Sequence, residues 1–207
     1  MEALKQFGIV PVDSDVLKSV YQSYKQPLNK LADLERKGHL IRLKRGMYVV
    51  SPAISGKKLS LELIANHLYG ASYVSMETAL RHYGLIPEAV YVMASMTTKS
   101  SRNFKNELGQ FEYIHCPPRY FSIGINQIVR DDFAYLVATP EKALCDLIAY
   151  TPRLQPRFLK SMQKYLEEDL RLDMDEFYKM DVQIFEQCVA VGKKKSEILN
   201  LIKLLKS

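Results

Sequence analysis

The chain has 207 residues, of which 47% are hydrophobic and 25% are charged. This is the composition of an ordinary soluble globular protein, long enough for one large domain or for a small domain joined to a medium one. The sequence has no apolar run near the roughly 20 residues that cross a bilayer, and its start lacks the layout of a signal peptide. We therefore expect a cytoplasmic protein with no membrane partner.

The side chains that usually hold metals or cofactors show no suitable spacing. Three cysteines lie far apart, which predicts buried free thiols rather than disulfides or a zinc knuckle. They are Cys116, Cys145 and Cys188. The four histidines lack metal-ligand spacing, and the nine glycines form no phosphate-binding motif. The sequence therefore predicts no cofactor and no metal.

The formal net charge of +6 makes an anionic partner plausible, and its distribution says more. Seven cations and only two acids lie between residues 25 and 45. A second group of lysines lies between residues 193 and 206. The positive charge is thus concentrated near the two ends, and the middle of the chain is close to neutral.

Two helices are predicted in the first forty residues. The first begins at Asp13 or Ser14, and its apolar residues follow a helical stripe. The second begins at Pro27, which suits a first helical turn, and ends before Gly38, which favours the left-handed conformation that stops helices. The residues of this second helix expected to face the core are Leu28, Leu31 and Leu34.

A change of period after residue 40 predicts a β-hairpin. Residues 40–43 and 47–50 form two short apolar runs, and Lys44-Arg45-Gly46 forms a tight basic turn between them. Two helices followed by a basic hairpin is the order of a winged helix-turn-helix, whose second helix enters the major groove of DNA. We assign residues 1–52 to this domain.

The outward face of the second helix carries hydrogen-bond donors that suit DNA. Asn29 fits adenine, Lys30 fits guanine or a phosphate, and the cations at the end of the helix and in the wing fit the DNA backbone. Several neutralised phosphates would make binding strongly salt-dependent. The predicted DNA-binding residues are Lys25, Gln26, Asn29, Lys30, Arg36, Lys37, Arg42, Lys44 and Arg45.

Residues 51–58 have linker composition, and a larger domain is predicted over residues 59–207. Its pattern is mixed α+β, with strands in the middle and helices gathered at its end. Helices are expected near 59–69, 75–83, 156–170, 174–191 and 195–206, and another from Pro140, while strands are expected near 89–94, 111–115 and 133–137.

Five short motifs occur in a defined order over most of the chain. They are RGMY at 45–48, SYVS at 72–75, AL at 79–80, GL at 84–85 and PEKALCD at 140–146. Together they resemble the AbiEi antitoxin family, although the Asn- and Ser-rich stretch at 97–106 departs from it. The resemblance implies a two-domain protein that represses its own operon by binding inverted repeats in its promoter. It also implies a C-terminal domain that counters a nucleotidyltransferase-like toxin of an abortive-infection, phage-defence system of type IV.

Structural roles suffice for most motif residues. Tyr48 and Tyr73 are expected to be core aromatics, and Ser75 an N-cap. Glu141 is expected to be a favourable first-turn acid and Lys142 a solvated lysine. The oligomeric state stays open, as does direct contact with a toxin.

Two other functions are compatible with the sequence. A winged helix also serves as a protein-docking adaptor. A metal-dependent nuclease needs clustered carboxylates, and the candidates are Glu141, Asp146, Asp131 and Asp132. Five helical residues separate the first two by about 140° around a helix, so they do not share a face. We therefore do not expect an enzyme.

Overall fold

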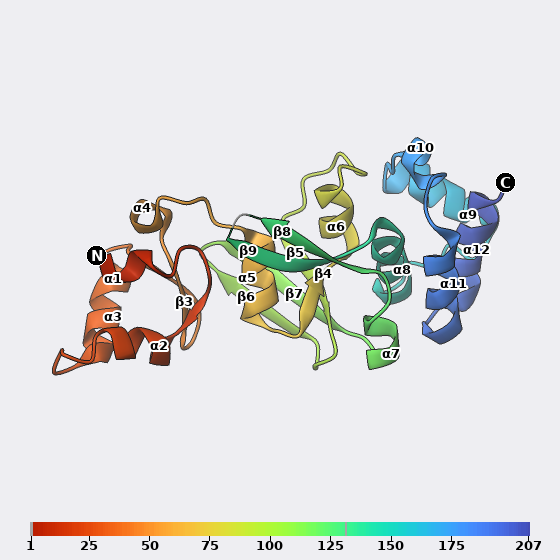
Figure 1. The fold of residues 1–207 in the computed structure, drawn as a ribbon. Helices are drawn as coiled ribbons and strands as arrows, with labels where there is room; N and C mark the ends of the chain where they lie inside the picture. Colours follow the sequence, from red (N-terminus) through yellow and green to blue (C-terminus); the bar gives the residue numbers. More distant parts are fainter. Residues whose placement is uncertain (1, 131) are drawn as a thin grey trace.

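The computed structural model describes residues 2–130 and 132–207. Figure 1 shows an elongated molecule, with the N-terminal helices and hairpin at one end, a sheet in the middle and the last helices at the other end. Helices and mixed sheets are both present, so the predicted α+β class is confirmed.

The N-terminal unit consists of three short helices and a three-stranded antiparallel sheet of order β1-β3-β2. The two predicted helices and the predicted hairpin all form. A strand of two residues, β1, precedes the second helix and pairs with β3. The elements are α1 (Glu2–Lys5), β1 (Val12–Asp13), α2 (Ser14–Val20), α3 (Pro27–Arg36), β2 (Leu40–Lys44) and β3 (Met47–Val50).

Helix α3 has the predicted ends but not the whole predicted apolar face. Pro27 occupies its first turn, and Gly38 follows it with a left-handed φ of 68°. Leu31 and Leu34 are buried, whereas Leu28 is 61% exposed, so its expected core position is wrong. Three-residue steps rotate by about 300° each, so Leu28 and Leu34 lie about 120° apart around the helix. Leu28 is therefore outside the buried stripe.

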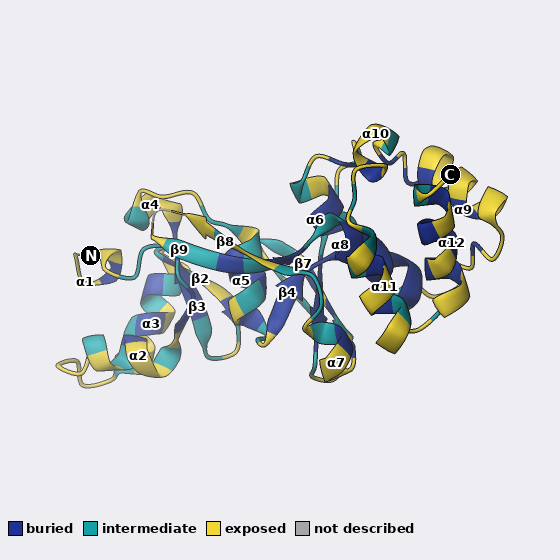
Figure 2. Ribbon diagram, turned by 45° about the vertical axis from the view of Figure 1, so that its right-hand side comes forward, coloured by how far each residue is buried: buried dark blue, intermediate teal, exposed yellow. Residues whose placement is uncertain are grey.

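The hairpin is buried on both faces. Leu40, Tyr48 and Val50 belong to the small N-terminal core. On the other face, Leu43 and Val49 belong to the large core of the second domain. Alternation along a strand produces this division, and Figure 2 shows the buried hairpin between the two regions. The hairpin thus joins the two cores.

The expected linker contains a turn of helix, α4 (Pro52–Ser55). Pro52 suits its first position, and Gly56 closes it with a left-handed φ of 69°. Ile54 packs against the N-terminal core. The composition of this segment indicated flexibility, but one apolar side chain and two helix signals are enough to fold it.

The second domain contains a six-stranded mixed sheet of order β6-β7-β5-β4-β9-β8. The β5–β7 and β4–β9 pairs are parallel and the other pairs are antiparallel. The sequence predicted three of these strands and missed β4, β6 and β8. The strands are β4 (Ser72–Val74), β5 (Val92–Thr97), β6 (Arg102–Asn106), β7 (Gly109–His115), β8 (Ile125–Arg130) and β9 (Phe133–Ala138).

Helices cover the sheet and continue beyond its end. Two of the expected helices are divided: residues 156–170 become α9 and a π-helical segment, Tyr165–Asp169, and residues 174–191 become α10 and α11. Asp181 divides the second pair because its carboxylate caps the start of α11. The helices are α5 (Leu61–Leu68), α6 (Met76–His82), α7 (Pro118–Phe121), α8 (Pro140–Tyr150), α9 (Leu159–Lys164), α10 (Met174–Phe177), α11 (Val182–Val191) and α12 (Lys195–Leu205).

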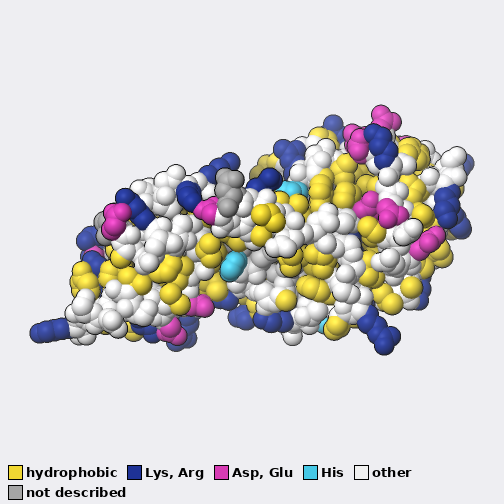
Figure 3. Space-filling view, in the orientation of Figure 1, with side chains coloured by type: hydrophobic (Ala, Val, Ile, Leu, Met, Phe, Trp, Pro, Cys, Tyr) yellow, Lys and Arg dark blue, Asp and Glu magenta, His cyan; other side chains and the backbone are white. Residues whose placement is uncertain are grey.

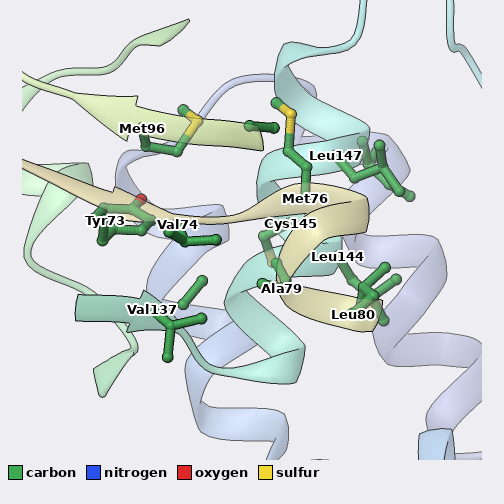
Figure 4. Packing of buried hydrophobic residues seen from close by; sticks show 14 of the residues in the cluster. Tyr73, Val74, Met76, Ala79, Leu80, Met96, Val137, Leu144, Cys145 and Leu147 are labelled. Carbon is green, nitrogen blue, oxygen red and sulfur yellow. The ribbon is translucent and has the colours of Figure 1, made fainter. Parts of the chain in front are cut away.

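Helix α8 is the centre of the larger core. The predicted cap is present, since the Thr139 hydroxyl accepts a hydrogen bond from the backbone of Lys142, and nine of the eleven helical residues are buried. Figure 4 shows Leu144 and Leu147 of α8 among side chains of α6 and of strands β4, β5 and β9. The motif at 140–146 therefore lies in the core rather than on the surface.

A network of buried polar side chains crosses this core. Lys142 is fully buried, with its Nζ 3.2 Å from an Asp146 carboxylate oxygen and donating to the Tyr120 carbonyl at 2.9 Å. The other Asp146 oxygen accepts from the hydroxyls of Ser75 (2.6 Å) and Tyr73 (3.1 Å). The expectation of a solvated Lys142 is wrong. Ser75 occupies the N-cap position of α6, but its hydroxyl bonds to Asp146 instead of capping the helix.

Candidate nucleic-acid interface

The exposed face of α3 carries the polar residues that the sequence assigned to DNA. Positions 26, 29, 30, 33, 36 and 37 recur every three or four residues, so they share a face. Gln26 is the N-cap residue, but its side chain accepts no capping hydrogen bond from the backbone; its side-chain oxygen accepts from Asn29 instead. Both side chains are exposed, as is Lys25 in the preceding loop. The beginning of α3 thus presents amide groups and a lysine to solvent.

The far end of α3 holds its cations in ion pairs. The Asp33 carboxylate lies 2.8 Å from Lys37 Nζ and 2.6 Å from Arg36. Hydrogen bonds from Lys37 and then from Arg36 lower the pKa of Asp33. These two cations are exposed, but the Asp33 carboxylate already offsets part of their charge.

Arg42 of β2 is held in a similar way. Its guanidinium lies 2.6 Å from Glu35 of α3 and 5.5 Å from the ring centre of Tyr48. The hydrogen bond to Glu35 is the main reason why the pKa of Arg42 is raised. The pair ties the hairpin to α3. It also leaves Arg42 on the same side of the unit as the end of α3.

Lys30 belongs to an aromatic group beside α2. Its Nζ lies 5.2 Å from the ring centre of Tyr24, which is itself 48% exposed and packs edge-on against Tyr21 at 5.8 Å. A cation over a ring is attracted to its π-face and keeps its hydrogen-bond donors free. Lys30 therefore remains available to an acceptor outside the protein.

Lys44 and Arg45, the two cations at the hairpin turn, differ in their contacts. Lys44 donates to the backbone carbonyl of Leu68 at 2.6 Å, which ties it to the second domain. Arg45 is exposed beside Gly46, whose φ of 80° allows the tight turn. The structure thus places both Lys44 and Arg45 at the junction between the domains, while the other predicted residues lie on α3, in the loop before it or, for Arg42, beside its end.

Two basic residues that the sequence analysis did not select also lie at this junction. Lys99 and Arg102 line one hollow together with Lys44 and Arg45. The expected loop at 97–106 is partly strand β6, and its pairing with β7 fixes the position of Arg102. In the sequence these residues are only two cations in a polar segment. Such a segment shows no hydrophobic periodicity, so nothing in it indicated a strand or a site. Figure 3 shows Lys and Arg side chains both at the N-terminal end and along the lower edge of the molecule.

The carboxylates proposed for a nuclease do not come together. Glu141 accepts from the backbone of Asp181 at 3.0 Å, and Asp146 is buried with Lys142. Asp132 pairs with Lys57, and Asp131 lies outside the described residues. Among residues 2–130 and 132–207 there is no group of three His, Cys, Asp or Glu side chains placed to hold a metal ion.

A large hollow lies in the second domain, away from α3. It has a volume of about 980 Å³ and lies among α6, β5, β7 and the π-helical segment. Its lining includes Glu77, Glu112 and Asp169, together with Tyr91 and Tyr165. These carboxylates give it a chemistry opposite to that of the basic surface, so it is not a candidate for nucleic acid.

The remaining sequence expectations concern the thiols and the membrane. The three cysteines are buried and free, as predicted. Within the described part of the chain, every helix is too short or too polar to span a bilayer.

Comparison with known proteins supports the fold. No protein-family model matches the chain, and no curated protein matches it. Among solved structures, the crystal structure of the RV2827C protein from Mycobacterium tuberculosis is similar, with a TM-score of 0.51 and 13% sequence identity. The match covers 99% of this chain and 78% of that chain. At this identity the likeness concerns the α+β fold alone, and it extends over both parts of the molecule.

Proposed function

We propose that the chain is a DNA-binding transcriptional repressor that acts on its own operon, with residues 1–52 as a winged helix-turn-helix. The order of helices and strands in the N-terminal unit is the one that this interpretation requires. The observation that carries the proposal is the exposed start of α3, with Gln26, Asn29 and Lys30, beside a basic hairpin. In this geometry α3 is the recognition helix and the hairpin is the wing.

The proposed roles follow from the contacts of each side chain. Gln26 and Asn29 lie near the helix start, which enters deepest into a major groove, and each amide pairs well with adenine. Lys30 and Arg45 keep free donors for phosphates or guanine. Arg36 and Lys37 lie at the far end of the helix, where phosphates are the nearest groups, so they position the protein rather than select a sequence.

The proposal includes an antitoxin role for the second domain, directed against a nucleotidyltransferase-like toxin. Its support is the resemblance of the ordered motifs to the AbiEi family. The segment 140–146 contributes to the core through α8 and the Lys142–Asp146 pair. These motif residues build the domain and are not the surface that acts on a toxin.

Binding to the protein's own upstream DNA tests the repressor proposal. We would titrate the full chain into a labelled operator duplex and a scrambled duplex across a salt series. Asn29→Ala is expected to reduce the preference for the operator by about 1–3 kcal/mol, because one bidentate base contact is lost. Lys30→Ala is expected to weaken both duplexes and to lower the salt slope by about 1.

A matched control removes charge elsewhere. Lys160→Ala changes an exposed lysine of α9, at the other end of the molecule, and is expected to leave both affinities unchanged. Equal affinity of the wild-type protein for operator and scrambled DNA contradicts the operator proposal. No binding to either duplex at low salt contradicts DNA binding altogether.

One observation favours a protein-docking adaptor as the second candidate. Leu28 of α3 is 61% exposed, at the edge of the buried stripe formed by Leu31 and Leu34. An exposed leucine suits an apolar partner surface better than a phosphate. The adaptor hypothesis predicts that Leu28→Ala abolishes co-purification of a protein partner while the chain binds no duplex at low salt.

A further inference from the structure

A hollow of about 490 Å³ lies where the hairpin meets the second domain; we call it the junction hollow. Its size is within the range of small-molecule sites. Both domains contribute to it, so its shape depends on their contact. The residues that line it are Lys44, Arg45, His67, Tyr69, Gly70, Lys99, Arg102 and Phe104.

The four cations of the junction hollow come from two segments that are far apart in the sequence. Lys44 ends β2 and Arg45 follows it, Lys99 lies in the loop after β5, and Arg102 begins β6. The lining contains no carboxylate. In the described part of the chain, none of the four has a carboxylate within the 4.0 Å of an ion pair, unlike Arg36, Lys37 and Arg42.

Aromatic rings lie close to three of these four cations. Lys99 Nζ lies 5.2 Å from the ring centre of Tyr69, and the Arg102 guanidinium lies 5.9 Å from the same ring. Arg102 also lies 5.1 Å, and Lys44 Nζ 5.9 Å, from the ring centre of Phe104. Ring faces attract cations without neutralising them. The rings therefore stabilise positive charge in the junction hollow without using the hydrogen-bond donors of these side chains.

The electrostatics of Lys44 agree with this geometry. Burial is the main reason why the pKa of Lys44 is lowered, and repulsion from Lys99 and Arg102 adds to it, while Asp13 acts in the opposite direction. The Lys44 ammonium is anchored by the Leu68 carbonyl, a neutral acceptor. A bound anion would relieve this repulsion and complete the hydrogen bonding of all four cations.

We propose that the junction hollow binds a small free anion that carries several phosphate groups, of the class of inorganic triphosphate or the triphosphate of a nucleotide. Four convergent cations match a multiply charged anion better than a single monoanion. The guanidinium groups of Arg45 and Arg102 suit bidentate contact with phosphate oxygens, and the two lysines act as point charges.

The charge density of a small polyanion fits the junction hollow better than that of a DNA backbone. Along one strand of a duplex a single charge occurs about every 3.4 Å of the helix axis, on a convex surface. The junction hollow is concave and receives cations from both domains. One small polyanion can contact all four groups at once.

A regulatory consequence follows, and it rests on the proposed function. Arg45 belongs both to the junction hollow and to the turn of the proposed wing. An anion that holds Arg45 in the hollow withdraws it from DNA. Anion and operator therefore weaken each other's binding by the same factor, as linkage requires.

Calorimetric titration of inorganic triphosphate into the full chain, without DNA and without divalent cations, tests the site directly. We expect one saturable site in the wild-type protein, at least tenfold tighter than for sulfate at equal ionic strength. The double variant Lys99→Ala/Arg102→Ala is expected to lose at least tenfold in affinity. The control Lys160→Ala/Lys203→Ala removes two exposed charges from the C-terminal helices and is expected to bind as the wild type does.

The outcomes are distinct. Absent or non-saturable triphosphate binding overturns the proposal, as does equal weakening in the two double variants. Circular dichroism of each variant shows whether it is folded, and Arg102→Lys provides a milder change that keeps the charge and loses only bidentate contact. If triphosphate does not bind and Lys99→Ala/Arg102→Ala weakens only duplex binding, these cations contact DNA instead of a small anion, and the proposal fails. If triphosphate binds and no duplex does, the anion site stands and the repressor proposal fails.

Discussion

Ion pairs differ sharply between the two parts of this molecule. At the end of α3, Asp33 pairs with Arg36 and Lys37 at the surface, where the two cationic side chains are 79% and 54% exposed. In the second domain, Lys142 and Asp146 pair with no exposure at all. The distances are similar, 2.6 and 2.8 Å against 3.2 Å, so distance does not distinguish them.

Burial decides what each pair does. Water and salt screen a surface pair, so its charges remain exchangeable and a phosphate can displace Asp33. A buried pair cannot exchange, because separating it leaves a charge in a medium that does not solvate it. The N-terminal pairs would therefore adjust the proposed DNA binding, whereas the Lys142–Asp146 pair maintains the fold.

The largest expected effect is on the buried pair. Asp146→Ala leaves Lys142 without its carboxylate and removes the acceptor of Ser75 and Tyr73. We expect the free energy of unfolding to fall by about 3–5 kcal/mol, measured by denaturant titration. The double variant Lys142→Met/Asp146→Leu removes both charges and is expected to lose much less. Equal losses in the two variants would show that the charge pair is not the cause.

The next largest effect on the free energy of unfolding is expected in the small N-terminal core. Leu31→Ala removes a fully packed side chain of α3, 1% exposed, and is expected to cost about 2–4 kcal/mol of unfolding free energy. Leu28→Ala, three residues earlier on the same helix but exposed, is expected to change it by less than about 0.5 kcal/mol. Thermal melts of both variants measure the difference. A similar loss for Leu28→Ala would contradict its exposed position.

A smaller effect is expected when Asp33 is neutralised. Asp33→Asn releases Arg36 and Lys37 from their pairs, so duplex affinity should rise a few-fold at low salt and the salt slope should steepen. Fluorescence anisotropy with operator DNA measures both quantities. Glu186→Gln is the control, since it removes a surface acid that pairs with Lys206 far from α3. Unchanged affinity for Asp33→Asn would exclude these two cations from the interface.

The smallest effect concerns pH. The pKa of Asp33 is lowered in the folded protein, so its contribution to stability is present above the unfolded value of about 3.9 and is lost as the pH falls below it. Screening of these surface pairs by water and salt keeps this contribution slight. The carboxylate chemical shift of Asp33, followed by NMR from pH 7 downwards, should titrate below the ordinary aspartate range. Titration at or above that range would show that the pairs with Lys37 and Arg36 do not persist in solution.

Local signals predicted the parts of the fold that local chemistry determines. Pro27 and Gly38 gave the ends of α3, and Thr139 gave the start of α8. Strand β6, by contrast, is a polar segment that becomes a strand because β7 pairs with it. Edge strands carry few apolar residues, so their periodicity is weak. Such pairing is tertiary information that the sequence pattern does not contain.

The candidate site was predictable where it is continuous in the sequence. The nine proposed DNA-binding residues lie within 21 consecutive positions, and seven of them precede the hairpin turn that lies at the junction between the domains. Lys99 and Arg102 are more than fifty residues from Lys44 in the chain and meet it only through the contact between the domains. Lys142 was expected to be solvated but is fully buried. Nothing in its helical position indicates that other elements pack on that side of α8 as well.

The hairpin that serves both cores has a consequence for how the chain unfolds. Separating the two parts would expose Leu43 and Val49 on one side, and melting the small part would remove their support from the other. We therefore expect one cooperative transition in place of two, and a fragment that ends at residue 52 would present an apolar strand surface to water. The orientation of α3 relative to the sheet is therefore fixed, and the two domains would approach a DNA duplex as one rigid body.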